Sequence, residues 1–182
     1  MRLRRGDSFL LVVDVQQKLA PHVVDHEGII RRAEGLIRCA TLLGVPVLLS
    51  EHSPDNIGAT VAPLAALAAP AQILKKTHFA CTDQPACLEA FRALKKTQVV
   101  VAGMEAHVCV MQTALGLLDR GFQPFVVHDA VGSRREGDRA AALERMRSAG
   151  CAPATAEMAM FEWMENADSA EFRDVLRLVK SL

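Results

Sequence analysis

Three residues with nucleophilic or ionisable side chains stand where apolar runs of this sequence end. Cys109 lies in the first turn of a helical pattern that follows the apolar run 98–102. A helix N-terminus favours a thiolate and offers free N–H groups to an oxyanion, so we expect the pKa of Cys109 to be lowered. Asp14 ends the run 9–13, and Lys76 follows the run 72–74. Such a set of groups is suited to attack by a thiol on a carbonyl carbon.

Each of the three residues also has a structural interpretation. Asp14 could cap the turn that follows its strand, and the pair Lys75–Lys76 is typical of a solvated strand end. Cys109 could be a small buried hydrophobe, as free cysteines commonly are. In open parallel sheets, ligands bind beyond the carboxyl ends of the strands, so the positions of these residues keep the catalytic interpretation open.

Short apolar runs alternate with helical patterns along the whole chain. The runs are almost continuously apolar, which is typical of strands buried on both faces of a parallel sheet. Helical spacing is clearest before Gly44, Gly121 and Gly150, and again in 168–182 with Asp168 or Ser169 as the N-cap. The sequence therefore predicts a three-layer α/β/α, Rossmann-like fold with a mainly parallel sheet of about six strands, in one domain over residues 1–182. The expected strands are 9–13, 45–49, 72–74, 98–102, 125–127 and 152–155.

Composition argues against several classes of partner. The 182 residues carry 21 Lys+Arg and 21 Asp+Glu, so the chain offers no electrostatic attraction to nucleic acid or to an anionic membrane. Aromatic residues make up 4 %, with no Tyr and one Trp, which argues against a base-stacking surface. No window reaches the roughly 20 apolar residues of a membrane-spanning helix. We expect a cytoplasmic protein that acts on a small molecule and binds neither nucleic acid nor membrane.

The remaining cysteines and histidines give weaker signals. No cysteine pair has C-x-x-C spacing, which indicates reduced thiols rather than a zinc or redox site. His52 follows the second run and is expected to line the crevice, but Glu51–His52 is only a fragment of a metal site. We therefore expect no metal and no other cofactor. Cys39, Cys87 and Cys151 are expected to be structural. Cys81 follows Lys76 closely and could approach the crevice, although a structural role is favoured.

Four motifs are spread over almost the whole length of the chain: LLVVDVQ at Leu10–Gln16, KTHF at Lys76–Phe79, GMEAHVCVMQTALGLLDRG at Gly103–Gly121 and the later HDAVGSR. With these motifs the chain resembles the isochorismatase-like (cysteine hydrolase) superfamily. The segment GMEAHVCV followed by QTA is the most specific of these. Within the superfamily the chain is most similar to small isochorismatase-domain proteins, whose physiological substrates are mostly unassigned.

This resemblance implies a role for each candidate residue. Asp14 matches the general base that takes the thiol proton, Lys76 matches the catalytic lysine, and Cys109 matches the nucleophile. The resemblance also implies a cis peptide bond between Met104 and Glu105, which would aim the N–H of Glu105, with that of Cys109, at an oxyanion. These roles fit hydrolysis of a small amide or related acyl compound through a thioester at Cys109.

The same resemblance suggests which residues surround a substrate. With aromatic residues so scarce, Leu19 and Phe79 are the expected pocket walls, and Gln16 and His52 are further candidates for substrate contact.

Nicotinamidases carry an Asp-x-His element and a further His that bind a metal, and SEHSPDN at 50–56 does not reproduce that spacing. True isochorismatases cleave a vinyl ether and can lack the cysteine, so that reaction is an alternative, with Arg134 or Arg135 as contacts for an anionic substrate.

Two other functions stay open at this point. One is a catalytically idle oligomeric binding or scaffold protein, because one fold serves many functions. The other is a redox-sensing thiol, for which Cys81 would have to be the partner of Cys109. The apolar segment Met158–Met164 either closes the core or forms a subunit interface, and we expect a homo-oligomer of two or more copies.

Overall fold

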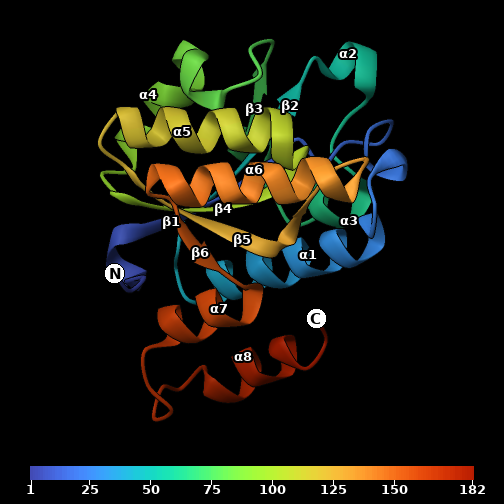
Figure 1. Cartoon of the computed structure of the whole chain (residues 1–182). Coiled ribbons are helices and arrows are strands. Elements are labelled where there is room, and N and C mark those ends of the chain that lie inside the picture. The colour runs from blue at the N-terminus through green and yellow to red at the C-terminus, as the bar shows by residue number, and fades with distance from the viewer.

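The computed structural model describes all 182 residues, and its centre is a six-stranded sheet with helices on both faces (Figure 1). All neighbouring strands run parallel, in the order β3-β2-β1-β4-β5-β6. The predicted α/β/α architecture with about six strands is thus confirmed. The strands are β1 Ser8–Val13, β2 Val47–His52, β3 Ile73–Lys76, β4 Gln98–Met104, β5 Gln123–Gly132 and β6 Ala152–Ala154.

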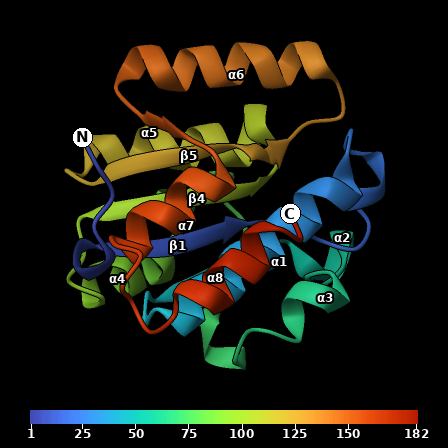
Figure 2. The same ribbon diagram turned by 90° about the horizontal axis from the view of Figure 1, so that it is seen from below.

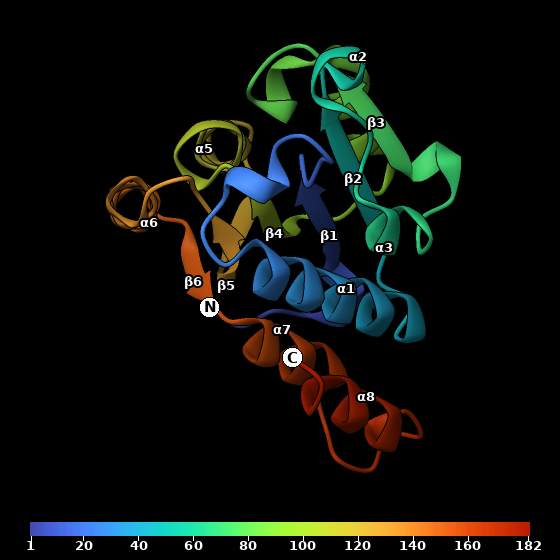
Figure 3. The same ribbon diagram turned by 90° about the vertical axis from the view of Figure 1, so that its right-hand side faces the viewer.

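The helices divide between the two faces of the sheet (Figures 2 and 3). On one face α1, α7 and α8 pack together, and on the other face α4, α5 and α6 cover a second apolar cluster. The α-helices are α1 His26–Leu42, α2 Pro54–Ile57, α3 Ala62–Ala65, α4 Pro85–Ala93, α5 Met111–Asp119, α6 Glu136–Ala149, α7 Ala156–Met164 and α8 Phe172–Val179. Short 3₁₀ turns are Arg5–Asp7, Ala20–His22, Pro70–Gln72 and Cys81–Asp83, and Ala106–Val110 forms a π-helical turn.

Several strands extend further than their apolar runs. The predicted runs stop at the last apolar residue, but β2 continues through Ser50–His52 and β3 through Lys76. Ladder hydrogen bonds join backbone groups, so polar residues continue a strand when its neighbour is present. These polar strand ends lie at the carboxyl edge of the sheet, which is the edge where parallel sheets bind ligands.

Three helices end close to the glycines that predicted their ends, but the predicted start of the last helix differs from the structure. Gly44, Gly121 and Gly150 lie within two residues of the ends of α1, α5 and α6, and their φ angles are 70°, 81° and 109°. The predicted cap of the last helix is wrong, because α8 begins at Phe172 with Glu171 as its N-cap. The hydroxyl of Ser169 bonds the Glu171 carboxylate instead of a helical N–H in the first turn.

Gly103 brings the ends of β1 and β4 unusually close together. Its φ is +126°, and a Cβ built there would lie 2.0 Å from the carbonyl oxygen of Val13. Only glycine avoids both the strained backbone and this clash. The contact fixes the residue that follows β1 beside the turn that follows β4, and these two segments carry Asp14 and Cys109.

Candidate active site

A buried ion pair joins the ends of β1 and β3. The ammonium of Lys76 donates to Asp14 Oδ2 at 2.6 Å, and both side chains are fully inaccessible to solvent. Regular alternation along β1 would place Asp14 with Leu10 and Val12, against α1. Asp14 instead has φ of 50°, which breaks the alternation, and its carboxylate meets Lys76. Lys76 lies two residues after Leu74 in β3, so regular alternation places both side chains on one face of the sheet. The side chain of Leu74 packs with the apolar cluster under α4 and α5.

The ammonium of Lys76 has an acceptor for each of its three protons. Besides Asp14, it donates to the carbonyl oxygens of His78 at 3.2 Å and Phe79 at 3.0 Å. Burial by itself would lower the pKa of Lys76, but the Asp14 carboxylate, with smaller contributions from Cys81 and Cys109, offsets this and raises the pKa above its ordinary value. Lys76 is therefore a permanent cation at neutral pH, and it also holds the loop after β3 in place.

The thiol of Cys109 lies next to this ion pair. Cys109 is 7 % exposed and belongs to the π-helical turn Ala106–Val110 that leads into α5. Burial is the main cause that raises its pKa, followed by the negative charge of Asp14, while Lys76 acts in the opposite direction. The expectation of a lowered thiol pKa is therefore wrong. The helix start and the lysine do not outweigh desolvation and the carboxylate, and the resting thiol is protonated at neutral pH.

This arrangement favours a thiol that loses its proton during attack rather than before it. A carboxylate held at the thiol is a general base within reach, and a fixed cation beside it balances the charge of that carboxylate. The thiol, the carboxylate and the ammonium are all buried, and electrostatic interactions are stronger in a buried site than in bulk water.

The turn before Cys109 has a fixed backbone and a second ion pair. The peptide bond between Met104 and Glu105 is cis, as the resemblance implied. The Glu105 carboxylate accepts from Arg134 Nε at 2.7 Å, and its side chain is 10 % exposed. Arg134 is thus already paired with a carboxylate, whereas Arg135 precedes α6 as its N-cap residue. Binding of an anionic substrate by Arg134 would have to compete with this pairing.

Two expected pocket residues have other partners in the structure. Gln16 is fully buried, and its amide nitrogen donates to the carbonyl oxygens of His52 and Gly58 at 3.1 and 2.6 Å. Its amide oxygen accepts the N–H of His52 at 2.7 Å. All of these partners are backbone groups, so the side chain of Gln16 braces the end of β2. Leu19 is half-buried and packs against the cluster beneath α1.

His52 and Phe79 form an aromatic wall beside Lys76. Their rings stack with centroids 5.2 Å apart, and His52 is the register partner of Lys76 in the sheet. Phe79 is 51 % exposed, while the Nδ1 atom of His52 is buried without a hydrogen-bond partner. This pair fits a wall that contacts an apolar or planar part of a ligand.

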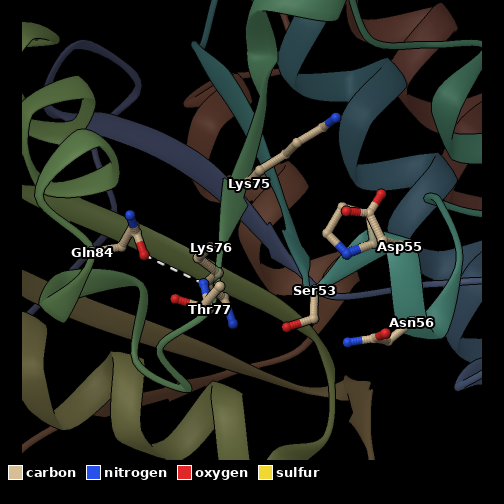
Figure 4. Close-up of a pocket in the computed structure, with 8 residues that line it drawn as sticks. Ser53, Asp55, Asn56, Lys75, Lys76, Thr77 and Gln84 are labelled. Atoms are coloured by element: carbon tan, nitrogen blue, oxygen red, sulfur yellow. Dashed lines mark hydrogen bonds between the residues drawn. The ribbon is translucent and has the colours of Figure 1, made fainter.

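A pocket of about 320 Å³, lined by polar residues, lies at the carboxyl end of β3 (Figure 4). Its lining comes from the segments after β2 and β3, and it does not include Asp14 or Cys109. Lys75 and Lys76 leave the strand in different directions, and Gln84 bonds the N–H of Thr77 at 3.3 Å. The pocket therefore adjoins the ion pair without containing Cys109. The lining residues are Ser53, Pro54, Asp55, Asn56, Lys75, Lys76, Thr77 and Gln84.

The sequence interpretation missed Ser50. Its hydroxyl donates to Asp14 Oδ1 at 2.7 Å, so the two carboxylate oxygens have separate donors, Ser50 and Lys76. The available signal was a single hydroxyl directly after the apolar run 45–49, since burial of a hydroxyl is costly without a partner. Cys81 was expected to be structural, and it is fully buried beside the same groups.

The described residues contain no group of three or more His, Cys, Asp or Glu side chains arranged to hold a metal ion. None of the helices is both long enough and apolar enough to cross a bilayer. His107, two positions before Cys109, has its Nδ1 atom 2.9 Å from Ser133 Oγ.

Comparison with known proteins places this geometry in a family. Residues 8–158 match the Isochorismatase domain family. Isochorismatase domain-containing protein 2 from Bos taurus is 37 % identical over 180 residues, which cover 98 % of this chain and 86 % of that protein. The MAR1 ribonuclease from Caenorhabditis elegans has a TM-score of 0.93 and 34 % identity, with 99 % of this chain and 93 % of that one covered. The YcaC gene product from Escherichia coli, an octameric hydrolase of unknown specificity, has a TM-score of 0.90 and 26 % identity over 100 % and 96 % of the two chains. Because the family match spans most of the sequence and the whole fold is shared, the chain belongs to the isochorismatase family.

Proposed function

We propose that this isochorismatase-family protein is a cysteine-dependent hydrolase of a small amide or related acyl compound. The observation that carries the proposal is the fully buried pair of Lys76 and Asp14, 2.6 Å apart, beside the thiol of Cys109. Burying two charges costs free energy that hydrophobic residues in the same place would not cost. An idle scaffold has no physical need for this pair next to a thiol.

In the first half of the reaction, the thiol of Cys109 attacks the carbonyl carbon while its proton passes to the Asp14 carboxylate. The tetrahedral oxyanion is bound by the backbone N–H groups of Glu105 and Cys109. The carbon–nitrogen bond then breaks, Asp14 returns the proton to the departing amine, and a thioester remains on Cys109.

In the second half, Asp14 takes a proton from water, which attacks the thioester carbonyl. The carbon–sulfur bond breaks, the carboxylic acid leaves, and the proton returns to the sulfur of Cys109. Throughout both halves Lys76 stays protonated and holds the Asp14 carboxyl group in place, so that Asp14 is a carboxylate at the start of each half. His52 and Phe79 form the wall against which the acyl group or the amine packs.

The thioester supplies the test of this proposal. The protein is incubated with a panel of small amides and activated esters, quenched in acid, and examined by intact-mass and peptide mass spectrometry. We expect an acyl adduct on the peptide that contains Cys109, and its loss on treatment with hydroxylamine. An adduct confined to other cysteines, or steady hydrolysis by a Cys109→Ala variant, would exclude the covalent route. Turnover of a vinyl ether without any adduct would favour the isochorismate-type reaction.

A structural relative named a ribonuclease makes RNA a necessary substrate control. This chain has zero formal net charge, and the phosphate backbone normally requires a cluster of basic side chains. We therefore propose a small-molecule substrate and expect no cleavage of a fluorescent single-stranded RNA. Cleavage that persists in purified protein and disappears in Cys109→Ala would overturn the choice of substrate class.

We also propose that the chain forms a homo-oligomer. Segment Met158–Met164 falls within α7, where Met160, Trp163 and Met164 are buried in the core. On the outer side of the same helix Met158 is 48 % and Phe161 37 % exposed. The octameric structural relative supports an assembly of more than two copies. Sedimentation velocity at micromolar concentration should show an oligomer, and Phe161→Glu should weaken it; a monomeric wild type would contradict the proposal.

A further inference from the structure

Ser50 holds Asp14 at two points. In the parallel ladder Ser50 is the register partner of Val13, and its carbonyl oxygen accepts the N–H of Asp14 at 3.1 Å. Its hydroxyl donates to Asp14 Oδ1 at 2.7 Å. Backbone and side chain of one residue therefore fix both the main chain and the carboxylate of Asp14.

The position of Asp14 requires such a restraint. Its φ of 50° lies in the left-handed region, which costs free energy for a residue with a side chain. A carboxylate with one ion-pair partner is still free to rotate about its Cβ–Cγ bond. With Lys76 on Oδ2 at 2.6 Å and Ser50 on Oδ1, the plane of the carboxylate is set from both sides.

Ser50 is itself fixed by its surroundings. It is 1 % exposed, and it follows Val47, Leu48 and Leu49 in a strand that is otherwise apolar up to that point. The fully buried Cys81 lies next to it, and the backbone N–H of Cys81 donates to Thr113 Oγ1 at 2.9 Å. Thr113 stands four residues after Cys109, on the next turn of the same helical segment. Buried polar contacts thus connect β2, whose Ser50 bonds Asp14, to the helical segment that carries Cys109.

We propose that Ser50 is a positioning residue of the active site, which orients the Asp14 carboxylate for proton transfer to and from the sulfur of Cys109 and water. This inference rests on the proposed function, because it concerns the base of that reaction. Ser50 does not touch the reacting atoms. Its hydroxyl keeps its proton throughout and acts only through Asp14.

The test follows acylation and deacylation separately with p-nitrophenyl acetate. The release of nitrophenolate reports acylation, and the decay of the acetyl-Cys109 mass reports deacylation. We expect Ser50→Ala to slow both steps by about 10- to 100-fold, the range for one hydrogen bond to a charged group. Ser50→Cys, with a weaker donor in nearly the same volume, should fall between the wild type and Ser50→Ala.

Ser8→Ala is the matched control. Ser8 is equally buried, stands at the opposite end of β1 and bonds Arg4 O at 2.6 Å and Gln98 Oε1 at 3.2 Å. This variant should keep both rates, while its thermal melting temperature falls about as much as that of Ser50→Ala. Equal rates in wild type, Ser50→Cys and Ser50→Ala would overturn the positioning role alone. A wild type that forms no acetyl-Cys109 at all would overturn the proposed function, and the positioning role with it.

Discussion

Cys109→Ala is expected to lower kcat for the best amide or ester substrate by at least about 10⁴-fold, because no other group can form the thioester. The side chain is small and 7 % exposed, so the sheet and the helices around it should persist. Turnover is measured together with circular dichroism and thermal melting. Retained structure with lost turnover is the expected combination.

The matched control for this variant is Cys39→Ala. Cys39 is another buried thiol, in α1 on the opposite face of the sheet, and burial raises its pKa to about 12. It should lose stability without losing specific activity. If Cys109→Ala retained the activity of Cys39→Ala, the covalent role of Cys109 would be excluded, whereas a wild type without turnover on any substrate of the panel would favour an idle binding protein.

The second large effect is expected from Asp14→Asn, and it has opposite signs in two assays. Hydrolysis should fall by at least about 10²-fold, since the amide cannot accept the thiol proton. Alkylation of Cys109 by iodoacetamide should instead become faster near neutral pH. Burial raises the pKa of Cys109 most, the charge of Asp14 raises it further, and Lys76 lowers it. Removal of the carboxylate leaves the effect of burial in place, but the attraction of Lys76 for the thiolate is then no longer opposed by Asp14.

The measurement is the alkylation rate of Cys109 against pH, resolved by peptide mass spectrometry. In the wild type, the raised pKa means that the rate should be low at neutral pH and rise into the alkaline range. In Asp14→Asn the midpoint should move down by about one pH unit or more. Lys76→Met should move it the other way. A midpoint that is the same in all three proteins would show that the ion pair does not act on the thiol.

These two assays also separate the redox alternative from the hydrolase. A sensor thiol needs a lowered pKa and an accessible partner. Cys81 is fully buried, and burial and the charge of Asp14 raise its pKa, so it is a poor partner for Cys109 in oxidation. The same two causes act on Cys109, which favours a thiol activated only when a substrate is present.

Sequence alone determined the architecture of this protein and gave three candidate site residues that the structure brings together. Continuous apolar runs are required of strands buried on both faces, and the glycines after α1, α5 and α6 mark backbone angles that other residues avoid. Asp14, Lys76 and Cys109 could be proposed as a site because the carboxyl ends of parallel strands meet at one edge, and because the motifs that contain them resemble those of a family.

Tertiary structure decided the electrostatics and the supporting contacts. The pKa of Cys109 depends on how much water the fold removes and on the place of Asp14, and neither quantity is encoded in the local helical pattern that predicted a lowered value. The contact of Ser50 with Asp14 joins residues 36 positions apart in the chain. It exists because β1 and β2 pair in one register and because a left-handed backbone turns the carboxylate toward Lys76. Local sequence specifies which side chains are available, whereas only the folded sheet sets their distances and their exposure to water, on which their chemistry depends.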